Sequence, residues 1–168
     1  MEALEQLRMS KRLSEISQEV GFTLWQIQEL ENVLAHYFVL VTKATRGMGL
    51  EGGNTLIADA QSKTFGKIIS QLIKAGHLNQ ELEPRFKALL SERNWLVHKS
   101  RISSRSAVHS DAAMNNLIKR LHNIAEESLI LIKNLSVLVE QHVKTHGVTD
   151  KQIQANAQKI LEKWHTFD

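Results

Sequence analysis

The segment Ser91–Lys99 reads SERNWLVHK and carries three side chains suited to phosphodiester chemistry. His98 supplies an imidazole, and histidine is the residue type best suited to proton transfer near neutral pH. Arg93 can pair two phosphate oxygens at once, because its planar guanidinium stays charged. Asn94 can orient the imidazole or hold a phosphate oxygen. Together these residue types suit attack by a ribose 2′-OH, which must lose a proton while the leaving 5′-oxygen gains one.

The spacing of these residues also matters. Asn94 and His98 are four residues apart, so their side chains share one face of a helix. Three basic residues, Lys99, Arg101 and Arg105, follow at once, and we expect them to bind the RNA backbone. The same three charges are also typical of a helix C-terminus followed by a solvated loop.

The pattern Arg-Asn-x-Leu-x-His, from Arg93 to His98, resembles the signature of HEPN domains (higher eukaryotes and prokaryotes nucleotide-binding). The resemblance is specific over residues 92–99 and extends by helix order over about 23–146. It implies a homodimeric helical bundle that acts as a metal-independent endoribonuclease, without a cofactor, in toxin–antitoxin, anti-phage or RNA-processing systems. It implies catalysis by Arg93, Asn94 and His98, and RNA and an antitoxin or regulatory protein as partners.

One departure from the family concerns regulation. A toxin subgroup has Tyr two positions after the His, and partner enzymes modify that Tyr. This chain has Ser100 there, so neither the modification nor the nucleotidyltransferase partner is carried over. The motif also supplies one His per chain, whereas the reaction needs an acid and a base. A symmetric dimer that joins two copies of the Arg93–His98 helix end would supply both.

Two other functions stay open. The chain can be a non-catalytic helical dimer that binds RNA, a nucleotide or a partner protein, since some HEPN proteins do not cut RNA. It can also be a purely structural bundle, in which case Arg93 and His98 should point apart and lie away from any interface.

Two further patterns are expected to be structural. Gly47-Met-Gly49-Leu-Glu-Gly52 matches the dinucleotide fingerprint, but that fingerprint needs a preceding strand, and here a helix is predicted. His142 and His146 share a helix face and form at most half of a metal site, with no carboxylate at a spacing that completes it. We therefore expect a glycine loop, two solvated histidines and no metal site.

Composition narrows the fold class and the location. The chain has 168 residues, of which 42% are hydrophobic, with eight Gly, one Pro and no Cys, so long helices are favoured and disulfides are excluded. A net charge of +3 permits an RNA partner. The N-terminus lacks a signal-peptide core, and the most apolar run, residues 129–139, is too short to span a bilayer. We expect one domain over 1–168 in a cytoplasmic protein.

Apolar periodicity predicts an all-α, antiparallel up-and-down helical bundle with a core over about 23–146. Gly21 and Gly76 are expected to end helices, Pro84 to lie in a first helical turn and Asp111 to cap the longest helix. The leucine seam of that helix should pack against residues 23–45. The expected helices are 2–20 and 149–164 at the periphery and 23–45, 62–75, Pro84 to about 99–101, and 111–146 in the core, with loops over 46–54 and 100–110.

Overall fold

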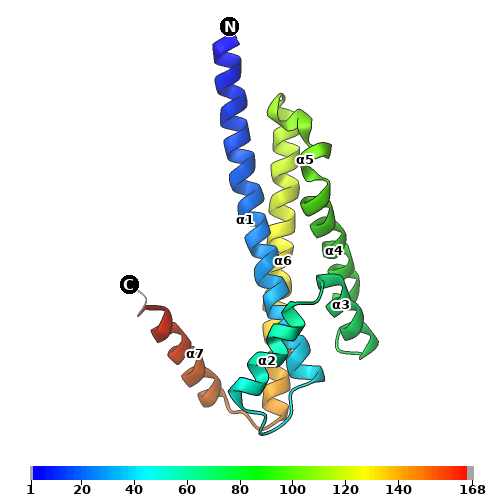
Figure 1. Ribbon diagram of the computed structural model, residues 1–168, viewed down its shortest axis with the longest axis vertical. Helices are drawn as coiled ribbons and strands as arrows, with labels where there is room; N and C mark the ends of the chain where they lie inside the picture. The colour runs from blue at the N-terminus through cyan, green and yellow to red at the C-terminus, as the bar shows by residue number, and fades with distance from the viewer. Residues whose placement is uncertain (1, 166–168) are drawn as a thin grey trace.

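The computed structural model describes residues 2–165, and every regular element within that range is helical (Figure 1). The predicted all-α bundle is therefore confirmed. The elements are α1 (Glu2–Thr42), α2 (Gly49–Gln61), α3 (Phe65–Lys74), α4 (Leu82–His98), α5 (Ser100–Ser103), the 3₁₀ turn η1 (Arg105–Val108), α6 (Asp111–Thr145) and α7 (Asp150–His165).

Successive long elements reverse direction, as an up-and-down bundle requires (Figure 1). The chain reverses direction between α1 and α4 and again between α4 and α6, so α6 runs in the same direction as α1. Contacts along the pair follow this direction: Arg12 donates to Asp111 at 2.7 Å, and Thr23 lies beside Leu121. The largest helix–helix interface thus joins two parallel helices, with α4 antiparallel to both.

The first helix is continuous, which corrects the predicted break at Gly21. Residues 2–20 are the beginning of α1 and do not form a separate helix. Glycine within a helix costs about 1 kcal/mol relative to alanine, which favours a break but does not impose one. Ile16 and Val20 before the glycine and Ile27 after it pack on the same core, so one apolar stripe runs past it and outweighs that cost.

The predicted loop over 46–54 is wrong in its second half, because α2 begins at Gly49. Gly47 and Gly49 adopt positive φ values of 86° and 75° and make the turn out of α1. Gly52 and the residues after it are helical. Packing overrides their low helix propensity, because Ala60 is buried and Leu56 lies against the core.

The boundaries of α3 and α4 follow local capping rules. The predicted helix over 62–75 is shorter, because α2 continues to residue 61 and the Thr64 side chain caps α3 by accepting from the Lys67 amide. Gly76 ends α3 with a φ of 71°, as predicted. Pro84 lies in the first turn of α4, also as predicted.

The predicted loop over 100–110 contains two short helical elements, α5 and η1. Ala107 is buried and holds this connection against the bundle. Asp111 was expected to cap α6, but the cap is Ser110, whose side chain accepts from the Ala113 amide at 3.4 Å. Asp111 is the first helical residue and pairs with Arg12 instead.

The leucine seam of α6 packs against α1, which confirms the predicted pairing of these two helices. Ser128 interrupts the seam but is satisfied, since its hydroxyl donates to the Ile124 carbonyl at 2.8 Å. The buried apolar residues form one continuous core cluster. Its most completely buried large side chains are Ile27, Leu30, Leu34, Ile69, Leu72, Phe86, Leu89, Leu121, Leu131 and Leu135.

Candidate functional site

The rotation of α4, which carries the predicted site, is fixed by two bidentate ion pairs with α6. Arg85 donates to both Glu127 oxygens at 2.7 and 2.8 Å. Arg120 donates to both Glu92 oxygens at 2.7 and 3.0 Å. These pairs are partly exposed, so they add little stability, but their two-point geometry specifies which face of α4 meets α6.

Trp95 connects the end of α4 to the turn that follows. The Arg120 guanidinium stacks on its ring, with Cζ 3.4 Å from the ring centroid. The indole Nε1 donates to the Ser103 hydroxyl in α5 at 3.0 Å. Sequence reasoning had given Trp95 and Arg120 no role, because contact between residues so far apart in the chain leaves no periodic signal.

Arg93 faces α1 and forms an ion pair there. Its Nε donates to Glu31 Oε1 at 3.0 Å, and about 29% and 30% of the two side chains is exposed. Glu31 was not predicted as part of the site. The pairing fixes the guanidinium at the α1–α4 interface and offsets part of its positive charge.

Asn94 and His98 lie on the outer side of α4, and both are exposed. Four residues of helix bring them to one face, as predicted. Arg93 and His98 are five apart, which places them about 140° apart around the helix axis. Within residues 2–165 no hydrogen bond joins Arg93 to either of the other two, so one chain brings together Asn94 and His98 but not the whole predicted triad.

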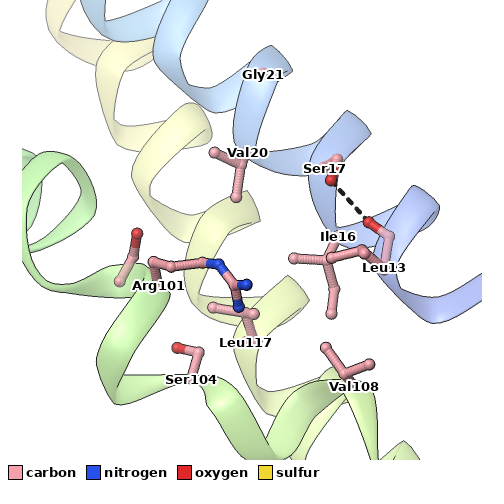
Figure 2. Close-up of a pocket in the computed structure, with 10 residues that line it drawn as sticks. Leu13, Ile16, Ser17, Val20, Gly21, Arg101, Ser104, Val108 and Leu117 are labelled. Atoms are coloured by element: carbon pink, nitrogen blue, oxygen red, sulfur yellow. Dashed lines mark hydrogen bonds between the residues drawn. The ribbon is translucent and has the colours of Figure 1, made fainter. Parts of the chain in front are cut away.

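The predicted RNA-binding residues lie on the connection between α4 and α6, and all three are exposed. Lys99 is the C-cap of α4, Arg101 lies in α5 and Arg105 begins η1. None of them forms an ion pair with another residue in the described part of the chain. The Arg101 guanidinium extends across the mouth of a cavity between α1 and α5 (Figure 2).

The two remaining sequence patterns lie at the opposite end of the bundle. Helix α1 precedes Gly47, so the glycine pattern does not follow a strand. The rings of His142 and His146 are 4.5 Å apart, and burial together with nearby His146 and His77 lowers the pKa of His142. Across residues 2–165, no group of three or more His, Asp or Glu side chains is placed to hold a metal ion.

Comparison with family models, with curated proteins and with solved structures gives no match to this chain. The HEPN resemblance therefore depends on residues 92–99 and stays a prediction. No helix in the described range is both long and apolar enough to cross a membrane.

Proposed function

We propose that this chain is a metal-independent endoribonuclease of the HEPN type that works as a homodimer. The supporting observation is that Asn94 and His98 are exposed together at the end of a helix whose orientation two bidentate ion pairs fix, directly before a basic connection. This end of α4 combines a proton-transfer group, an amide and unpaired positive charge on one surface, which suits an RNA strand.

The proposed reaction divides proton transfer between two chains. His98 of one protomer takes the proton from the ribose 2′-OH, and the 2′-oxygen attacks the phosphorus. The bond to the 5′-oxygen breaks, and the protonated His98 of the second protomer gives its proton to that leaving oxygen. A 2′,3′-cyclic phosphate and a 5′-OH result, so no water, oxidant or metal is consumed.

Arg93 is proposed to stabilise the phosphate charge that develops in this reaction. Its Nε is held by Glu31, while no hydrogen bond within residues 2–165 engages its two terminal nitrogens. Glu31 thus presets the guanidinium and leaves two donors for phosphate oxygens. Because Arg93 and His98 point in different directions in one chain, the proposal requires Arg93 to act with His98 of the partner protomer.

Exposed apolar side chains beside the site support a dimer interface there. Val97, next to His98, is 47% exposed, and Ile102 in α5 is 67% exposed. Large apolar side chains near one end of a bundle are typical of surfaces that become buried in an interface.

The test is His98→Ala, with RNA cleavage followed by gel and the oligomeric state by light scattering. We expect the folded, dimeric variant to cut RNA about 100-fold more slowly or worse, because a general acid–base contributes about that factor. His109→Ala is the matched control, since His109 is exposed in the same connection but lies outside the motif. Full activity in dimeric His98→Ala, or cleavage by a monomeric wild type, would rule out the two-chain mechanism.

The absence of a metal requirement is tested separately. Cleavage should be unchanged by EDTA, provided that the RNA fold is checked in both conditions. Loss of cleavage in EDTA that added metal restores would contradict the mechanism.

The role of Arg93 is tested by substitution. Arg93→Ala should lower the rate of RNA cleavage. Glu31→Gln should lower that rate less, since this change removes the charge that positions Arg93 but not the guanidinium itself.

A second candidate function is a non-catalytic helical dimer that binds RNA, a nucleotide or a partner protein. The ion pair of Arg93 with Glu31 favours it, because this pair gives the arginine a structural role. Binding of RNA by the wild type without cleavage, under conditions where the dimer is intact, would select this function.

A further inference from the structure

A cavity of about 320 Å³ lies between the upper part of α1 and the connection from α4 to α6 (Figure 2). Most of the surface that lines it is apolar. Leu117 of α6 is buried, whereas the other aliphatic residues of the lining are partly or largely exposed. The aliphatic lining residues are Leu13, Ile16, Val20, Val108 and Leu117.

Among residues 2–165, Arg101 is the one charged residue that lines this cavity, and its guanidinium extends over the apolar lining (Figure 2). Within residues 2–165 it has neither an ion pair nor a side-chain hydrogen bond. The Ser104 hydroxyl, which lies on the same side of the cavity, also has no hydrogen-bond partner in that range. The polar side of the cavity therefore offers an unpaired cation and a hydroxyl, a combination complementary to an anion.

Gly21 lines the same cavity, in the middle of α1. A Cβ added at Gly21 would meet nothing within 4 Å. Glycine inside a helix costs about 1 kcal/mol relative to alanine, yet no contact in the described part of the chain requires it here. Close approach of a bound molecule to the helix backbone would require it, since a side chain at this position would project into the open space.

We propose that this cavity binds an anionic amphiphile, a linear aliphatic chain with a carboxylate or phosphate head group. The chain lies against Gly21 and the aliphatic lining, and the head group pairs with Arg101. The described lining residues include no aromatic side chain on which a nucleobase would stack, which favours an aliphatic ligand over a nucleotide. The volume lies at the small end of ligand sites, which suits one small molecule better than a helix of another chain.

The test is calorimetric titration of the full chain with dodecanoate, dodecyl phosphate and neutral dodecanol, the two anions below their micelle concentrations and dodecanol below its solubility limit. Both anions should bind, and dodecanol should bind about tenfold more weakly or worse, because it lacks the charge-assisted hydrogen bonds to Arg101. The tighter of the two anions identifies the preferred head group.

Four variants locate the site. Gly21→Leu should abolish binding by filling the cavity. Gly53→Leu is its matched control, since Gly53 is also helical with nothing within 4 Å of an added Cβ but lies outside the cavity. Arg101→Gln should weaken binding of both anions about tenfold, to the level of dodecanol, and Arg101→Lys should restore most of it. The two Arg101 variants keep the proposal testable if Gly21→Leu does not fold.

Several results would overturn the proposal. They are no binding by the wild type, equal affinity for dodecanol and the anions, or wild-type affinity in folded Gly21→Leu. Tighter binding of uridine 5′-monophosphate than of either anion would assign the cavity to a nucleotide. Loss of self-association in Gly21→Leu, with no amphiphile bound by the wild type, would assign it to a second copy of the chain.

Discussion

The two halves of α1 have the same helical backbone but very different surroundings. Every buried residue of this helix lies between Thr23 and Val39, where α2, α3 and α6 pack on it and Arg93 of α4 pairs with Glu31. In the first half, Leu13 continues the apolar spacing of Ile16 and Val20, yet it is 45% exposed. Leu4 and Leu7, nearer the start of the helix, are 66% and 61% exposed. Periodicity in the sequence therefore marks a surface that can be buried, while the number of neighbouring elements decides whether it is buried.

We call the end of the bundle that holds the N-terminal half of α1 and α5 the upper half, and the end that holds α2 and the C-terminal half of α1 the lower half (Figure 1). The difference between them predicts that stability is concentrated in the lower half, while the upper half carries the surfaces available to ligands and partners. The proposed dimer interface and the amphiphile cavity both lie in the upper half, where apolar side chains remain accessible. Regions with few buried contacts also open most easily.

The largest expected effect on stability comes from a substitution in the buried core. Leu135→Ala should lower the free energy of unfolding by about 2–5 kcal/mol, because Leu135 is fully buried and its truncation leaves a cavity. Leu4→Ala is the matched change in the exposed half and should alter stability by less than about 0.5 kcal/mol. Urea unfolding measures both. A comparable loss in Leu4→Ala would show that the upper half is buried in an oligomer.

Replacing two glycines by alanine should change the free energy of unfolding by intermediate amounts, with opposite signs in the two variants. Gly21→Ala should raise the free energy of unfolding by about 0.5–1 kcal/mol, since alanine favours a helix and meets no neighbour there. Gly76→Ala should lower it by about 1 kcal/mol or more, because Gly76 has a φ of 71° that alanine rarely adopts. Equal shifts in the two variants would contradict the assigned backbone conformations.

The smallest expected effect is a dependence on pH at the lower end of the bundle. Burial, then His146 and His77, lower the pKa of His142 below its usual 6.5, so the unfolded chain takes up this proton first as the pH falls. Stability contributed by neutral His142 is present above about pH 6.5 and is lost below it. His142→Gln should flatten the fall in melting temperature between pH 7 and about pH 5. An unchanged slope would contradict the shift.

Much of the fold followed from the sequence, because it depends on local rules. Apolar periodicity predicted the long helices, and Gly76 ended a helix as expected, since its positive φ is a local requirement. Gly21 did not end a helix. Packing of α1 on α6 decides whether the helix continues there, since a glycine alone is compatible with a break and with a continuous helix. The helical start of α2 among glycines was missed for the same reason.

The candidate site likewise has features that the sequence predicted and features that it did not. The common face of Asn94 and His98 followed from their spacing on one helix. The pairing of Arg93 with Glu31 joins residues 62 positions apart, and that of Arg120 with Glu92 joins residues 28 apart. Such contacts depend on how helices are placed against one another, which no single-helix pattern records.

The parallel arrangement of α1 and α6 also has a consequence for synthesis of the chain. Thr23 donates to the Leu121 carbonyl across 98 residues of sequence, so the main interface cannot form until nearly all of the chain between them has been made. At about 5–20 residues per second, the ribosome needs roughly 5–20 s to add that length. Throughout that interval the face of α1 that packs on α6 lacks its partner helix, so the nascent chain is most exposed to chaperones, proteases and aggregation just before its last long helix emerges.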